Sequence, residues 1–199
     1  MNYKKSQLLV IIGLCFIMAG LLLAAYNLYD AARASASVSQ VIENIDTGQE
    51  LKENEIPDYI LNPQMDMPEQ EIDGHKYIGS LEVPACSLIL PVISKWSYPD
   101  LKIAPCRYKG SAYLDNMIIA AHNYPSHFGN LKNLQPMDAI VFTDIDGNSF
   151  RYQVVEKEVL KSTAIEEMEA GEWDLTLFTC TIGGADRITI RCEKQNSFM

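Results

Sequence analysis

The chain has 199 residues, of which 26 are Asp or Glu and 16 are Lys or Arg, so its formal net charge is −10. This length fits one ordinary domain together with an anchor or a linker. The acidic balance and the absence of a basic patch argue against a nucleic-acid-binding protein.

The first predicted element is a membrane-spanning helix. Residues 8–28 carry no charged side chain, and about 20 apolar helical residues cross the hydrocarbon core of a bilayer. Lys4 and Lys5 precede this stretch, which favours a cytoplasmic N-terminus. A cleaved signal peptide is the alternative, because an alanine-rich stretch follows Asp30, but its apolar core is usually only about 7–15 residues long. We expect a cytoplasmic tail at 1–7, an uncleaved anchor at 8–28 and the remaining chain outside the cell.

A stalk or linker is expected over residues 29–74. Val38, Val41, Ile42 and Ile45 recur with the spacing of one helix face, which predicts a short amphipathic helix. Three prolines between residues 57 and 74 are typical of a linker. The simplest interpretation of this region is a spacer between the membrane and a domain that spans residues 75–199.

The domain itself is predicted to be mainly β. Alternating and apolar runs, separated by turn residues, indicate a closed barrel or a sandwich. The Asp146-Gly147 pair favours a tight hairpin, and helical signal is confined to short stretches near Phe128–Leu134 and Thr163–Ala170. The predicted strands are Tyr77–Val83, Ser87–Val92, Met117–His122, Ala139–Thr143, Ser149–Val159, Leu175–Cys180 and Arg187–Cys192.

The last two strands carry the candidate chemistry. If they pair as an antiparallel hairpin in symmetric register, Cys180 faces Arg187, with Cβ atoms roughly 5 Å apart. Arg191 is the competing arginine, but in the same register it opposes Thr176, about 13 Å along the strand. A bulge in the loop would shift this register. The spacing therefore favours Arg187 as the arginine nearest the cysteine.

Three histidines could partner the cysteine. A cysteine attacks as its thiolate, a histidine within reach can exchange the proton, and an arginine can stabilise an oxyanion. His122 ends an apolar strand, where a barrel presents functional groups at its rim. His75 lies before the first predicted strand, and His127 lies in the following loop. The spacing leaves open a buried, inert Cys180 and a purely structural His122.

Metal sites are not expected. His122 and His127 lack a nearby third ligand for zinc. Asp144, Asp146 and Asn148 resemble the start of a calcium loop, but the later positions do not fit, so a hairpin turn explains them better. No cofactor is expected either.

The combined motifs resemble the sortase family. The run Thr176-Leu177-Phe178-Thr179-Cys180, joined by a short loop to Arg187-Ile188-Thr189-Ile190, is similar to the sortase signature. The run Ile119-Ala120-Ala121-His122-Asn123 resembles the histidine strand of that family, and Phe128–Leu134 resembles the segment that comes after this strand. Gly79–Pro84 and Leu90-Pro91-Val92 resemble the first two strands. The similarity covers roughly residues 77–193, which is nearly the whole domain.

The resemblance implies an eight-stranded β-barrel that catalyses acyl transfer. Cys180 would be the nucleophile, His122 the general acid and base, and Arg187 the oxyanion-stabilising residue, while Thr179 would fix the cysteine or contact the substrate. The substrate would be a surface protein or pilin with a sorting motif similar to Leu-Pro-x-Thr-Gly. A cell-wall peptide or pilin amine would resolve the thioacyl intermediate, on the outer face of a Gram-positive cytoplasmic membrane.

Some features depart from the family. Pilin-building members often carry an Asp-Pro-aromatic lid, whereas this chain has Asn62-Pro63 and Met67-Pro68 ahead of the barrel. Cys86, Cys106 and Cys192 are unusual for the family, and a disulfide among them stays open. Two other functions also stay open, a hydrolytic cysteine peptidase and a non-catalytic, membrane-tethered peptide-binding module.

Overall fold

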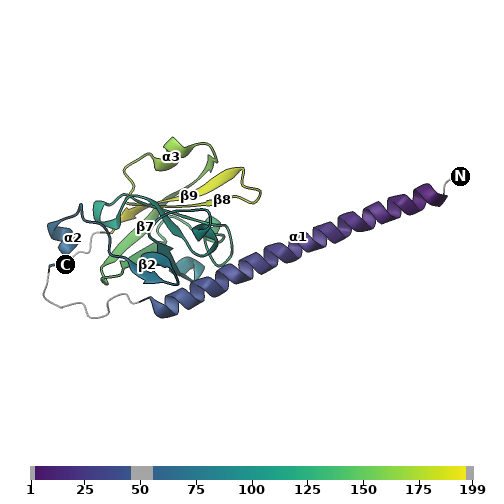
Figure 1. The fold of residues 1–199 in the computed structure, drawn as a ribbon. Coiled ribbons are helices and arrows are strands. Elements are labelled where there is room, and N and C mark those ends of the chain that lie inside the picture. Colours follow the sequence, from purple (N-terminus) through teal and green to yellow (C-terminus); the bar gives the residue numbers. More distant parts are fainter. Residues whose placement is uncertain (1–2, 46–55, 196–199) are drawn as a thin grey trace. The chain divides into compact units, whose positions relative to one another are not determined.

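A computed structural model of the chain describes residues 3–45 and 56–195 (Figure 1). By the density of contacts, the chain divides into two compact units, residues 1–33 and residues 34–199. Residues 46–55, which belong to the expected stalk, lie outside the described residues.

The described residues of the first unit, 3–33, lie within helix α1 (Tyr3–Asn44). Residues 7–44 of this helix are long and apolar enough to cross a membrane, judged by length and composition. The large apolar side chains of the predicted anchor are exposed, as Leu9, Phe16 and Leu22 illustrate. Helices of this length and composition occur both as membrane anchors and in signal sequences.

The C-terminal end of α1 belongs to the second unit. Ala34, Val38 and Val41 are buried there, on the helix face that the sequence spacing predicts. The Gln40 side chain donates a hydrogen bond to the Asp73 carboxylate over 2.9 Å. These contacts make the last turns of the helix part of the β domain's packing.

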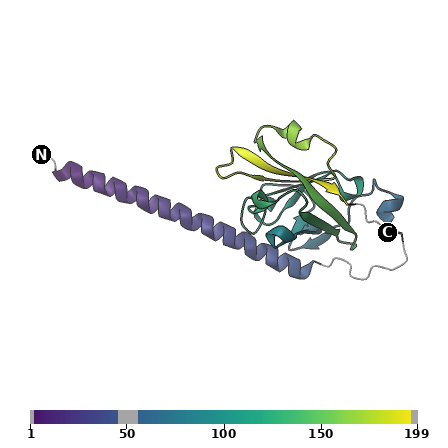
Figure 2. The ribbon, with the colours of Figure 1, turned by 180° about the vertical axis from the view of Figure 1, so that it is seen from behind.

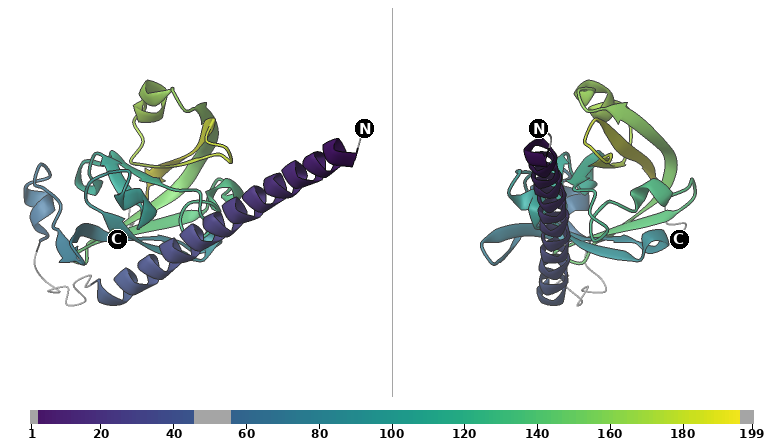
Figure 3. Two further views of the ribbon diagram at one scale, coloured as in Figure 1. Left: turned by 45° about the vertical axis from the view of Figure 1, so that its right-hand side comes forward. Right: turned by 90° about the vertical axis from the view of Figure 1, so that its right-hand side faces the viewer.

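Eight strands form a closed barrel. Their order is β2-β3-β4-β5-β8-β9-β7-β6, and β6 pairs back onto β2. Most neighbours are antiparallel, whereas β3–β4 and β5–β8 are parallel. The long strand β7 pairs with β6 along its first half and with β9 along most of its length (Figure 3). The strands are β2 (His75–Val83), β3 (Leu88–Ile93), β4 (Cys106–Lys109), β5 (Met117–Ala121), β6 (Ala139–Asp144), β7 (Ser149–Lys161), β8 (Leu175–Cys180) and β9 (Asp186–Lys194).

Closure of the barrel depends on a glycine. Gly79 lies where β2 pairs with both β3 and β6, and its φ is +148°. A Cβ atom at this position would lie 2.1 Å from the Thr143 carbonyl oxygen of β6. Only a residue without a side chain lets the two backbones approach this closely.

The segment expected to be a linker contains ordered structure. Helix α2 (Asp58–Leu61) and strand β1 (Gln70–Ile72) fall within residues 57–74, and β1 pairs with β2. The Tyr59 ring stacks on the Tyr113 ring with centroids 4.7 Å apart, and Met67 is buried. Prolines thus shape a segment that packs on the barrel, which proline content alone does not reveal.

The other predicted elements are close to those observed. All seven predicted strands occur, with ends shifted by at most a few residues, and the sequence missed β1 and β4 because both are short. The predicted helical stretches contain a 3-10 turn at Leu131–Asn133 and helix α3 at Ile165–Glu169. The mainly β prediction and the eight-stranded barrel are confirmed.

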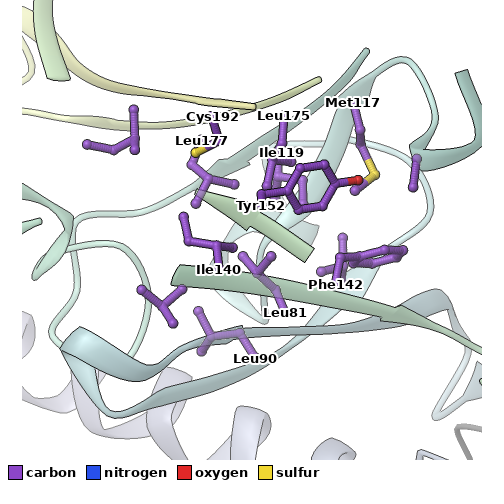
Figure 4. Packing of buried hydrophobic residues seen from close by; sticks show 14 of the residues in the cluster. Leu81, Leu90, Met117, Ile119, Ile140, Phe142, Tyr152, Leu175, Leu177 and Cys192 are labelled. Carbon is purple, nitrogen blue, oxygen red and sulfur yellow. The ribbon is translucent and has the colours of Figure 1, made fainter. Parts of the chain in front are cut away.

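The barrel interior is filled with apolar side chains from opposite walls. Leu81 and Leu90 approach from one side and Leu177, Leu175 and Cys192 from the other (Figure 4). Burial of such side chains contributes about 1.5–3 kcal/mol each. All five cysteines are free, so Cys86, Cys106 and Cys192 form no disulfide in this structure.

We expect Val41→Ala to lower the free energy of unfolding by about 2 kcal/mol, because two buried methyl groups are lost. Ser39→Ala on the exposed face of the same helix is the control and should change it by less than about 0.5 kcal/mol. Urea denaturation of the full-length chain in detergent micelles measures both values. Equal effects of the two substitutions would contradict the packing of α1 on the barrel.

Candidate active site

Two parallel strands bring His122 and Cys180 to the same edge of the sheet. Strand β5 pairs with β8 in parallel, and their last registered pair is Ala121 with Thr179. His122 and Cys180 each follow this pair by one residue. Because neighbouring strands lie about 4.8 Å apart, the two residues leave the sheet beside one another, although they lie far apart in the chain.

Thr179 links the ends of β5 and β8 through a hydrogen bond. Its hydroxyl donates a hydrogen bond to the Ala121 carbonyl over 2.8 Å, and the residue is buried. The bond therefore links the position before His122 to the position before Cys180. A buried hydrogen bond of this kind contributes about 1 kcal/mol and fixes the relative height of the two strands.

The β8–β9 hairpin brings Arg187 opposite Cys180. The observed register pairs Cys180 with Arg187 and Thr176 with Arg191, so the symmetric register predicted from the sequence is confirmed. Gly183 and Gly184 have φ values of +87° and +75°, which glycine adopts at no steric cost. The loop closes through a hydrogen bond from the Thr181 N–H to the Asp186 carbonyl over 3.0 Å.

The two arginines of β9 have different environments. Arg191 is 3% exposed, and its guanidinium bonds Glu158, Thr176 and the carbonyls of Glu167 and Met168. These bonds hold α3 against the β8–β9 hairpin, and the two lie together on one side of the barrel (Figures 1 and 2).

Arg187 is only half-buried. Its guanidinium donates two hydrogen bonds of 3.2 Å to the carbonyls of Gly184 and Asp186 in its own loop. Five N–H donors are available on a guanidinium, so capacity remains to bind an anionic or carbonyl oxygen. Arg187, rather than Arg191, is therefore the arginine that lies opposite Cys180 with donors still available.

The loop after β5 folds back to hold His122. The Phe128 N–H donates to the His122 carbonyl over 3.0 Å, and the Gly129 N–H donates to the Tyr124 carbonyl over 2.9 Å. The Tyr124 ring contacts two imidazoles at a tilt, with centroids 4.9 Å from His122 and 5.4 Å from His127. The sequence did not predict these ring contacts, because they depend on the loop conformation.

His127 is a buried, uncharged neighbour of the site. It is fully buried, and neither ring nitrogen has a hydrogen-bond partner of ordinary geometry in the described part of the chain. Burial, with a smaller contribution from His122, lowers its pKa to about 4, and the Ile103 backbone partly offsets this. His75 lies elsewhere, with Nδ1 2.9 Å from the Asp100 carboxylate.

Cys180, His122 and Arg187 line one cavity of about 270 Å³, which we call the aromatic cavity. Its wall includes Trp96, Tyr98, Tyr108 and Phe178, whose rings contact one another edge to face with centroids 4.8–6.0 Å apart. Tyr98 is 74% exposed at the mouth. Its other lining residues are Leu101, Ala120, Ala121, Lys161, Ser162, Ala164, Ile165, Met168 and Thr179.

Cys180 and Thr179 also line a second cavity of about 450 Å³, which we call the amide cavity. Two asparagines, Asn123 and Asn130, contribute to it from the loop after β5. The cysteine thus lines two cavities, one rich in aromatic rings and one that contains two asparagine amides. The other lining residues of the amide cavity are Pro125, Gly129, Lys132, Thr181, Ile182 and Ile188.

Within the described ranges, no group of three or more His, Cys, Asp or Glu side chains is placed to hold a metal ion. The calcium-like residues form a hairpin instead. The Asp144 carboxylate is buried and accepts hydrogen bonds from the Tyr113 hydroxyl and from the backbone and side chain of Asn148. Both carboxylate oxygens of Asp144 therefore accept hydrogen bonds within the protein.

Comparison with known proteins identifies the family. The model of the sortase domain matches residues 81–195, which is more than half of the chain, so this protein belongs to the sortase family. No curated protein matches the chain. The match covers the strands that carry Cys180, His122 and Arg187.

Solved structures show the same fold. Sortase C from Clostridium perfringens, with the C-terminal cell wall sorting motif, is 21% identical with a TM-score of 0.59 and covers 81% of this chain and 98% of its own. Sortase C1 from Streptococcus suis is 24% identical, with a TM-score of 0.54, and covers 61% and 74%. Sortase A from Corynebacterium diphtheriae is 20% identical with a TM-score of 0.54; the match covers 61% of this chain and 62% of that protein's length.

The different environments of the arginines lead to a stability prediction. Arg191→Met should lower the free energy of unfolding by about 2–4 kcal/mol, because buried carbonyls and Thr176 lose their donor. Arg187→Met, the matched control on the same face of β9, should lower it by less than about 1 kcal/mol. Equal losses in urea denaturation would contradict this division of roles.

The buried His127 leads to a pH prediction. An ordinary unfolded pKa near 6.5 and a folded pKa of about 4 mean that the folded state binds fewer protons. Stability should therefore be complete above about pH 6.5 and fall progressively toward pH 4, by an amount on the order of 3 kcal/mol. His127→Phe should flatten this slope in denaturation curves at pH 7, 6 and 5; an unchanged slope would rule out His127 as its source.

Proposed function

We propose that this protein is a membrane-anchored cysteine transpeptidase that cleaves a sorting motif similar to Leu-Pro-x-Thr-Gly. The observation that carries the proposal is the single cavity lined by Cys180, His122 and Arg187, in a chain that belongs to the sortase family. The registered pair of Cys180 and Arg187 adds support from the backbone.

The reaction follows from the chemistry of these three groups. The Cys180 sulfur, with its proton passed to His122, attacks the carbonyl carbon of the scissile bond. Arg187 donates hydrogen bonds to the oxygen as negative charge develops on it, a type of interaction worth about 10²–10³ in rate. His122 then protonates the departing amine, which leaves a thioester on Cys180.

An acceptor amine completes the transfer. Its nitrogen attacks the thioester, its proton goes to His122, and the sulfur leaves with the electron pair of the broken C–S bond. We infer that the acceptor is a cell-wall peptide or pilin amine, as the family implies. Thr179 holds the strand ends that carry the two reacting side chains, and its place in the cavity lining supports a contact with substrate.

The aromatic cavity suits an apolar, proline-containing peptide. Trp96, Tyr98, Tyr108 and Phe178 offer ring faces and edges against which leucine and proline side chains pack, and the backbone of the motif would run toward Cys180. A related sortase C has been solved with the C-terminal cell wall sorting motif, which supports a similar substrate for this chain.

The membrane helix completes the proposal. We infer that residues 1–7 are cytoplasmic, that 8–28 span the membrane, that 29–74 connect the span to the barrel, and that residues 75–199 form an extracellular catalytic domain. Lys4 and Lys5 ahead of the apolar stretch support this orientation. Surface proteins or pilins emerging from the same membrane would then be the substrates.

The test uses the full-length chain in detergent micelles with a library of Leu-Pro-x-x-Gly peptides, with and without glycinamide. We expect mass spectrometry to find a covalent acyl-enzyme and, with glycinamide, a transferred product. Cys180→Ala should abolish both, Arg187→Met should slow acyl-enzyme formation by about 10²-fold, and the control Cys86→Ala should change neither.

The outcomes separate the candidate functions. Cleavage whose products do not change with glycinamide would replace the transpeptidase with a hydrolytic cysteine peptidase. The absence of any acyl-enzyme across the library, in a chain shown to be folded, would favour a non-catalytic peptide-binding module.

A further inference from the structure

The amide cavity and the aromatic cavity meet at Thr179 and Cys180. Only Thr179 and Cys180 line both, whereas Arg187 and the aromatic rings line the aromatic cavity alone. A peptide whose carbonyl is bound at Cys180 and whose apolar residues occupy the aromatic cavity leaves the amide cavity to whatever lies beyond the scissile bond.

The chemistry of acyl transfer requires such a space. The departing amine and the incoming amine bond to the same carbonyl carbon, so by microscopic reversibility they pass through the same region around the sulfur. Asn123 of the amide cavity directly follows His122, the residue proposed to take the proton of the incoming amine. The cavity's position therefore fits the amine side of the reaction.

The amide cavity, like the aromatic cavity, has no acidic side chain in its lining. The chain carries a formal net charge of −10, yet none of the ten residues that line the cavity is acidic. Lys132 is the only charged lining residue, it is exposed, and it forms no ion pair with any carboxylate in the described ranges. Asn123 and Asn130 add amide groups that can both donate and accept hydrogen bonds.

We propose that the amide cavity binds the acceptor and selects an amine that carries a nearby carboxylate. This inference rests on the proposed function and names the class of its second substrate. The Lys132 ammonium would bind the carboxylate, and the asparagine amides would bind the peptide groups between carboxylate and amine. A cation in the cavity also favours the neutral, nucleophilic form of an incoming amine over its ammonium form.

The transfer step needs only the acceptor amine, Cys180 and His122. The acceptor nitrogen forms a bond to the thioester carbon, the C–S bond breaks, and the electron pair returns to the Cys180 sulfur. The amine proton moves to His122, which passes it to the thiolate. Lys132 takes no part in bond making, so its effect is confined to which acceptor is used.

The test compares two acceptors that differ only in the carboxylate, triglycine and triglycinamide. The full-length chain in detergent micelles is first incubated with a sorting peptide, so that the acyl-enzyme forms on Cys180. The rate at which each acceptor amine removes the acyl group is then followed by mass spectrometry at low ionic strength. We expect the wild-type chain to use triglycine roughly threefold faster than triglycinamide, which is the scale of one exposed ion pair. Added salt should reduce this ratio.

Matched lysine variants identify the side chain responsible. Lys132→Met should bring the ratio of the two rates to about one. Lys102→Met removes the same charge from an exposed lysine that lines neither cavity, and it should leave the ratio at the wild-type value.

Each failure has a distinct meaning. A ratio near one in the loaded wild-type chain, or a preference that survives Lys132→Met, overturns the inference and leaves the transpeptidase intact. An equal loss in Lys102→Met assigns the preference to the net charge of the domain and also overturns it. A chain that forms no acyl-enzyme overturns the proposed function and this inference together.

Discussion

The parallel pairing of β5 with β8 is the constraint on which the site depends. It is a long-range contact that joins residues 58 positions apart, and the Thr179 hydroxyl locks its end against the Ala121 carbonyl. A shift of either strand by one residue would turn His122 and Cys180 to opposite faces of the sheet, because side chains alternate along a strand. The rest of the barrel, including its tight closure at Gly79, holds these two strands in register.

The polar groups around the site are of two kinds. Some make all their hydrogen bonds within the protein, and others keep donors that can bind a substrate. Arg191 and Asp144 are buried with several hydrogen bonds each, and leaving such groups unpaired would cost more than the bonds gain. Arg187 and Lys132 keep donors facing solvent. This division explains why two arginines on one face of β9 have different expected effects on stability and on chemistry.

A second apolar cluster connects the end of α1 with the wall of the aromatic cavity. It contains Val41, Tyr77, Leu101 and Ala120, with Phe178 packed against it. The last turns of the helix therefore support residues that line the site. The three solved sortases described above are only 20–24% identical to this chain. They therefore inform its fold, and the proposed chemistry rests on its own residues.

The sequence by itself determined the mainly β class, the long apolar helix, the hairpin register of Cys180 with Arg187 and the resemblance to sortases. These features are local or depend on one turn, so period-two alternation and glycine spacing suffice to predict them. Only the tertiary structure decided that residues 57–74 pack on the barrel, that Tyr124 contacts two histidines, and that Cys180 lines two cavities. Such features arise from contacts between segments far apart in the chain, and their energies depend on burial and packing that no local pattern records.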